Sequence, residues 1–189
     1  MKKITTALCA TLLCSSLALA DDVKSLIGFE GGYSELGISN DATGATAYDE
    51  TESFAHGGIK IGAESKNYRF FLSGRYYDVA DFEHLTTMGA ELQYLMNFTS
   101  WMNMYFGASI GIMDAEFKDT SAAKRTLSDM YYGGDVGFNF HLGDSVDFEI
   151  GARVIDIQAD NTVGGVTYTL DPMITGYGSL IFKFNLDDI

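Results

Sequence analysis

Residues 136–154, VGFNFHLGDSVDFEIGARV, alternate between apolar and polar side chains almost throughout. One phase is apolar, from Val136 and Phe138 to Phe148 and Val154, whereas the other phase holds charges, histidine, asparagine and glycine. Successive side chains of a β-strand point to opposite faces, so this period of two predicts strands. The stretch is therefore predicted to form two strands joined by a tight turn, each with one apolar face.

The same alternation recurs in six further segments of the chain. The apolar phase carries no charge in any segment, and all the charges of these segments lie on the opposite phase. A period of two repeated this often is typical of an all-β domain. The eight predicted strands cover residues 27–33, 55–63, 68–76, 88–96, 102–112, 136–142, 146–154 and 174–184.

Two kinds of connection alternate along the chain. The short ones are residues 65–67, 97–101 and 143–145, and the longer polar ones are residues 34–53, 79–85, 114–127 and 156–171. Residues 122–127 have some helical character, but we interpret the whole of that connection as a loop. Short turns at one end and long loops at the other are typical of an up-and-down barrel in a bacterial outer membrane.

The side chains on the charged phase indicate which face points outward. That phase is rich in glycine, which weakens a strand face exposed to water but suits the narrow lumen of an eight-stranded barrel. Side chains such as Phe138, Phe140 and Phe182 are too bulky to share that lumen, and a charge facing lipid would cost about 2–4 kcal/mol. We therefore predict an all-β, eight-stranded antiparallel up-and-down transmembrane β-barrel. The alternative is a soluble periplasmic ligand-binding barrel with its apolar phase inside.

The first twenty residues have the pattern of a secretory signal peptide. Lys2 and Lys3 precede a short apolar stretch, and Ala18 and Ala20 place small residues before the expected cleavage site. We expect residues 1–20 to be removed and residues 21–189 to form the barrel domain. Both cysteines lie in the removed part, which leaves no disulfide or thiolate ligand. Losing two lysines changes the formal net charge from −14 to −16, which argues against nucleic-acid binding.

Charged residues on the inward phase form pairs of opposite sign. Counting across the turns brings Asp135 opposite Arg153, and places Glu30 near Lys60 and Arg75 near Glu91. One interpretation is a pathway for ions or protons. We favour a structural ion-pair network that plugs the lumen, because buried charges have to be paired and eight strands leave no room for a solute channel.

Histidines are the candidates for catalysis. Outer-membrane enzymes that modify lipid A need a histidine within reach of a serine and an acid. His56 lies three residues after Ser53, with Glu50 and Glu52 beside them, whereas His84 is expected in the second long connection and His141 on the inward phase near a short turn. We treat a lipid A acyl hydrolase or transferase as the alternative function and predict no catalytic residue and no cofactor.

The first long connection is rich in acidic residues that make it a candidate metal site. Asp41, Asp49, Glu50 and Glu52 supply the oxygen ligands that divalent cations prefer, and such a cation would be shared with lipopolysaccharide phosphates. Their spacing matches no defined calcium loop. We therefore predict a solvated acidic loop and no metal.

The opening stretch LIGFEGGYSEL and the closing stretch ITGYGSLIFKF resemble those of small outer-membrane β-barrels of the OmpA/OmpX-like family. The resemblance implies insertion into the outer membrane by the barrel assembly machinery, which reads the terminal strand at Tyr177, Phe182 and Phe184. Ser179 stands where that signal usually has glycine. The segment NLDDI follows Phe184, where such chains normally end at an aromatic residue. The resemblance further implies a monomer in contact with lipid and lipopolysaccharide. Its extracellular loops would serve envelope structure or bind a host or surface ligand.

Overall fold

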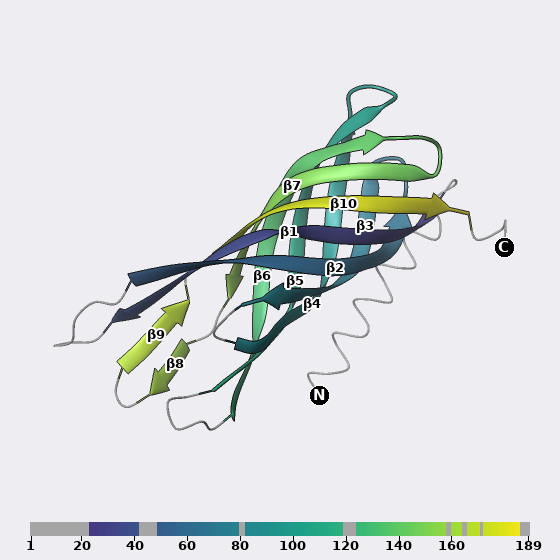
Figure 1. The fold of residues 1–189 in the computed structure, drawn as a ribbon. Helices are drawn as coiled ribbons and strands as arrows, with labels where there is room; N and C mark the ends of the chain where they lie inside the picture. Colours follow the sequence, from purple (N-terminus) through teal and green to yellow (C-terminus); the bar gives the residue numbers. More distant parts are fainter. Residues whose placement is uncertain are drawn as a thin grey trace, which may run out of the picture.

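The computed structural model describes residues 23–41, 49–79, 82–118, 124–157, 160–163, 166–170 and 172–185 (Figure 1). These residues contain no helix that is long and apolar enough to cross a membrane. The strands are β1 (Lys24–Asp41), β2 (Asp49–Glu64), β3 (Tyr68–Asp78), β4 (Phe82–Asn97), β5 (Met102–Lys118), β6 (Lys124–His141), β7 (Val146–Ile157), β8 (Asp160–Val163), β9 (Val166–Leu170) and β10 (Met173–Phe184).

Eight of these strands close into a barrel. Each of β1 to β7 pairs antiparallel with the next, β7 pairs with β10, and β10 pairs with β1. Following cross-strand partners once around the wall from Ser25 leads back to β1 at Glu35, a stagger of ten residues. A stagger of this size tilts the strands by about 40°. The predicted eight-stranded up-and-down barrel is confirmed.

The apolar phase faces outward, as predicted. Phe29, Ile59, Ile110 and Ile150 are each more than half exposed. A soluble barrel would bury such residues in its interior, because the hydrophobic effect favours their removal from water. Here they form an apolar band on the outside of the barrel.

The strands extend further than the sequence predicted at the end with the long connections. β1 continues to Asp41 and β2 begins at Asp49, so much of the predicted loop 34–53 is strand. The predicted loop 114–127 is also wrong, because β5 ends at Lys118 and β6 begins at Lys124. The last connection contains the hairpin of β8 and β9, which pairs with the end of β1 beyond the barrel (Figure 1).

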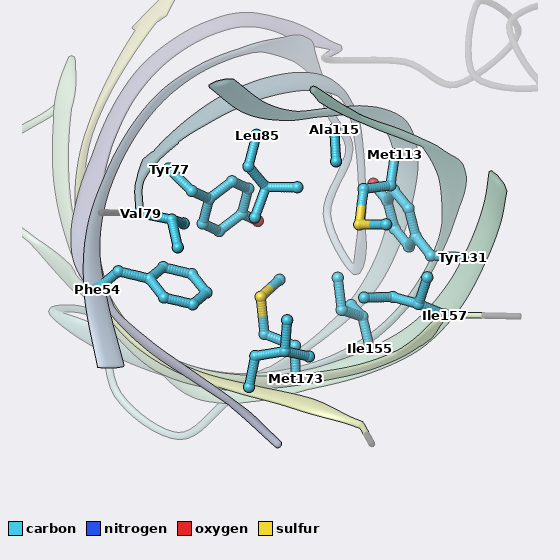
Figure 2. Packing of buried hydrophobic residues seen from close by; sticks show 11 residues of the cluster. Phe54, Tyr77, Val79, Leu85, Met113, Ala115, Tyr131, Ile155, Ile157 and Met173 are labelled. Carbon is cyan, nitrogen blue, oxygen red and sulfur yellow. The ribbon is translucent and has the colours of Figure 1, made fainter. Parts of the chain in front are cut away.

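The two faces of the wall exchange character at this end of the barrel. On β7, Arg153 points inward and Val154 outward, but Ile155 then points inward and Asp156 outward. Every other barrel strand also contributes an inward apolar residue at this end, so an apolar cluster fills the lumen above the charged residues (Figure 2). Its members are Leu36, Phe54, Tyr77, Val79, Leu85, Met113, Ala115, Tyr131, Ile155, Ile157 and Met173.

Glycines on the inner face make room for large side chains. The Tyr105 hydroxyl lies over Gly137 and Gly151, where a Cβ atom would collide with it. The His56 ring covers Gly32 in the same way, and a Cβ there would lie 2.6 Å from its Cε1 atom. The glycine-rich phase therefore allows bulky side chains to cross a narrow lumen.

Candidate functional site in the barrel lumen

Glu30 is the centre of the charged part of the lumen. Its Oε1 atom accepts hydrogen bonds from Arg75 Nε at 2.7 Å and from Arg153 Nη1 at 2.9 Å. Its Oε2 atom lies 3.1 Å from Lys60 Nζ, and His56 Nε2 lies 3.2 Å from Oε1. Four basic groups from β2, β3 and β7 thus converge on one buried carboxylate of β1.

A continuous chain of ion pairs runs from this centre toward the end with the short turns. Lys60 donates to Glu149 at 2.7 Å, and Glu149 also accepts from Arg69 Nη1 at 3.0 Å. Arg69 then contacts Asp147 at 3.4 Å, and Asp147 lies 2.6 Å from Lys183 Nζ. Side chains from opposite walls therefore meet along the lumen axis.

Two of the three predicted ion pairs are in contact, and the third is not. Lys60 contacts Glu30 as described, and Arg75 donates a hydrogen bond to Glu91. Asp135 and Arg153 are direct cross-strand partners, yet the Arg153 guanidinium contacts Glu30 and Glu91 instead. Asp135 accepts hydrogen bonds from Gln93 at 2.8 Å and from the Tyr177 hydroxyl at 3.2 Å.

The charges of the inward phase almost cancel. Six acids face five lysines and arginines, so nearly all of the formal net charge of −14 lies elsewhere. Taking charges out of water is costly unless they are paired and hydrogen-bonded, and every charge of this set except that of Asp135 contacts an opposite charge. These residues are Glu30, Lys60, Glu64, Arg69, Arg75, Glu91, Asp135, Asp147, Glu149, Arg153 and Lys183.

His56 does not meet the serine expected from the sequence. It points into the lumen, whereas Ser53 is exposed on the outer face of the same strand. Its Nδ1 atom lies 3.3 Å from Ser34 Oγ, and its Nε2 atom lies 3.2 Å from Glu30. Serine, histidine and acid are the groups of a nucleophilic triad.

That constellation is closed to substrates in this structure. Ser34 is fully buried and His56 is 7% exposed. Ser34 also bonds Thr175 at 2.9 Å, and the His56 ring packs 5.3 Å from that of Tyr77 at the base of the apolar cluster. The geometry therefore supports a satisfied interior hydrogen-bond network rather than an accessible nucleophile.

The structure describes the side chains of only some of the other candidate residues, which are the two remaining histidines and the acids of the candidate metal site. His141 lies inside near the short turns, with Nδ1 2.8 Å from Asp147. His84 belongs to β4 rather than to a loop, and its side chain lies outside the described residues, as do those of Asp41, Asp49 and Glu50. Among the residues that the structure describes, no cluster could hold a metal ion.

The similarity of this chain to known proteins lies in its structure and not in its sequence. No protein-family model and no curated protein matches the sequence. The barrel is similar to Neisserial surface protein A, with a TM-score of 0.59 and 16% identity over 82% of this chain and 97% of that one. It is also similar to the N-terminal β-barrel domain of Pseudomonas aeruginosa OprF, with a TM-score of 0.57 and 11% identity over 86% and 100% of the chains. Outer membrane protein OprG of the same organism gives a TM-score of 0.56 and 17% identity over 88% and 98%.

The fold is that of the small outer-membrane β-barrels. At this level the resemblance predicted from the opening and closing strands is confirmed. In this barrel the closing strand β10 lies beside β1, with Phe182 exposed to the outside and Tyr177 buried in the lumen. Ser179, the residue that replaces glycine, donates a hydrogen bond to Glu149 at 3.3 Å, so its hydroxyl belongs to the lumen network.

The apolar cluster above the charges was not among the features predicted from the sequence. The signal was present, because inward positions such as Phe54, Leu85, Met113 and Ile155 keep the period of two beyond the last outward apolar residue. Ser34 was not predicted for the same reason, because the predicted first strand ends at Tyr33.

Proposed function

We propose that this protein is an integral outer-membrane barrel whose plugged lumen passes no solute and whose extracellular end acts in envelope structure or surface interaction. The observation that carries the proposal is the outward apolar band around a barrel with a charged interior. Lipid is the environment in which this arrangement is stable, because it removes the band from water and leaves the charges paired inside.

Two layers of packing support a closed lumen. The charged network occupies the middle and one end, and the apolar cluster occupies the other end, with members 7% exposed or less (Figure 2). Eight strands leave an interior that side chains can fill. A hydrated ion entering from the apolar end would have to cross a layer with few polar atoms, at a high desolvation cost.

Electrophoresis in SDS tests the membrane placement. Small membrane barrels resist cold SDS as compact species, so the unheated protein from an envelope fraction should migrate faster than the boiled protein. A protein recovered from the soluble periplasm, with no change in mobility on boiling, would contradict the proposal and favour the soluble ligand-binding barrel.

A lipid A-modifying enzyme is the second candidate, and the contacts of His56 with Ser34 and Glu30 are the observation in its favour. We expect the masses of lipid A species to be the same in cells with the native protein, with His56→Ala and with no protein, because lipid cannot reach the buried serine. A lipid A mass that changes with expression and reverts with His56→Ala would establish the enzyme.

The partners follow from the same proposal. Lipid acyl chains would cover the outward band, lipopolysaccharide would surround the extracellular end, and the barrel assembly machinery would recognise β10. A closed barrel with a complete lipid-facing band has no need of a second subunit, which favours a monomer. Any host or surface ligand would bind beyond the membrane, where β1, β2, β8 and β9 project.

A further inference from the structure

A polar cavity of about 420 Å³ opens at the end of the barrel that carries the short turns. Lys24 of β1 and Lys183 of β10 line one side, and Lys66 of the β2–β3 turn lines another. Trp101, the only tryptophan of the chain, and Asn103 contribute from β5 and the turn before it. Its volume lies within the range of small-ligand pockets, about 300–1,000 Å³.

The charge of this cavity differs in sign from that of the protein. Lys183 is paired with Glu64 at 3.1 Å and with Asp147, and Arg69 also contacts these two acids. That set of four charges is neutral.

Apart from this neutral set, the described charged residues that line the cavity are two lysines and one acid. Lys24 Nζ donates only to the backbone oxygen of Asp144, at 3.5 Å, and within the described residues neither Lys24 nor Lys66 has a carboxylate at ion-pair distance. The Asp144 side chain in the β6–β7 turn also lines the cavity. Counted over the residues that the structure describes, the opening therefore carries a net positive charge in a protein whose formal net charge is −14.

An unsatisfied acceptor lies among the lining side chains. Asn103 is 2% exposed, and its Oδ1 atom receives no hydrogen bond from any described residue. Its Nδ2 atom lies 3.4 Å from His141 Nε2, and His141 Nδ1 in turn contacts Asp147, which fixes the orientation of both side chains. A buried acceptor without a donor is unfavourable, so a ligand that supplies an N–H group to this atom binds more tightly.

We propose that the cavity binds a short acidic peptide. Its carboxylates meet Lys24 and Lys66, and a backbone N–H group donates to Asn103 Oδ1. A simple anion such as phosphate or acetate can pair with the lysines at neutral pH, but it lacks the N–H group that Asn103 requires. The claim that this cavity faces the periplasm rests on the proposed function. The binding of a peptide to the folded barrel does not depend on it.

Fluorescence of Trp101 provides the test, with the full mature chain folded in detergent micelles. The probe is acetyl-Ala-Asp-Asp-Ala-amide, and its control is the same peptide with both aspartates replaced by asparagine. We expect saturable quenching by the acidic peptide and binding at least about tenfold weaker by the control, because the control cannot pair with the lysines.

Three variants locate the site. Lys66→Glu and Asn103→Leu should each weaken binding about tenfold, and the first lies in an exposed turn where it leaves folding intact. Lys118→Glu is the matched control, since Lys118 ends β5 at the opposite end of the barrel, and it should bind as the native chain does.

Other outcomes overturn the proposal. Equal binding of both peptides, no saturable quenching, or acetate competing as well as the peptide would each do so. Binding seen only after deletion of residues 186–189 would show that the chain's own acidic segment occupies the cavity instead. The mobility shift in SDS is measured separately, so membrane placement and peptide binding can fail independently.

Discussion

Arg153 of β7 donates two hydrogen bonds to Glu30 of β1 across β10, the strand that separates them. The distances are 2.9 Å from Nη1 to Oε1 and 3.2 Å from Nη2 to Oε2. Contacts between strands that are not neighbours arise because the lumen is narrow enough for long side chains to reach its axis. The ion network consequently ties together strands that share no backbone hydrogen bonds.

Removing the central carboxylate should destabilise the barrel strongly. Glu30→Gln removes the carboxylate that Arg75, Arg153 and Lys60 all contact, and breaking a buried ion network in this way costs about 3–5 kcal/mol. Asp135→Asn is the control, because Asp135 is held by Gln93 and Tyr177 rather than by a base. Urea unfolding in lipid vesicles measures the difference. Equal losses for the two variants would mean that Glu30 is not the centre of the network.

A charge on the outer face should be tolerated only beyond the membrane. Ile59→Arg places an arginine in the middle of the apolar band and should lower the free energy of unfolding by about 2–4 kcal/mol. Ser53→Arg, on the same face of β2 but beyond the band, should have little effect. Both variants are compared by urea titration in bilayers. If both substitutions are equally harmless, the band does not face lipid.

The apolar cluster should contribute to stability as a packed core. Met113→Ala removes a side chain that is 2% exposed and should cost about 2–5 kcal/mol, because a cavity remains inside the lumen. Met88→Ala changes the same residue type at a site on β4 that is 65% exposed. Its cost should be clearly smaller, because lipid can fill the space. The temperature of the mobility shift in SDS ranks the variants, and an equal shift would contradict a packed cluster.

Replacing a glycine by alanine should destabilise the barrel on the lumen face but not on the outer face. A Cβ atom at Gly151 would collide with the Tyr105 hydroxyl and lie 3.0 Å from Tyr177, so Gly151→Ala should cost about 1–3 kcal/mol. A Cβ atom at Gly74 meets nothing within 4 Å, and Gly74→Ala should leave stability unchanged or slightly higher. Thermal unfolding in detergent distinguishes them. A neutral Gly151→Ala would show that Tyr105 moves freely aside.

The barrel itself could be predicted because one physical rule fixes both its strands and its faces. Residues such as Phe138 and Phe148 keep the apolar phase in register with the pleat, and lipid allows no charge on that phase. The predicted strands are shorter than the observed ones because the prediction rests on the outward phase, which on β7 becomes polar after Val154 at Asp156. Ile155 and Ile157 on the other phase carry the information that was overlooked.

The partners within the lumen were harder to predict, because they depend on the stagger of the whole wall. Counting across a hairpin correctly placed Asp135 opposite Arg153. It could not reveal that Arg153 reaches past its neighbour to Glu30, a contact that depends on how β10 closes against β1. The pairing of His56 with Ser34 rather than Ser53 depends on the same kind of register, between β1 and β2.

In the proposed outer-membrane placement, the exchange of character between the two faces of the wall also determines how deeply the protein is immersed. Sinking by two residues per strand, about 5 Å, would press Glu35, Asp78 and Asp156 into hydrocarbon. Rising by the same amount would lift part of the outer band into water. In the proposed placement the bilayer therefore holds the barrel at one height, and the segments of β1, β2, β8 and β9 that project beyond it stand at a constant distance from the membrane surface.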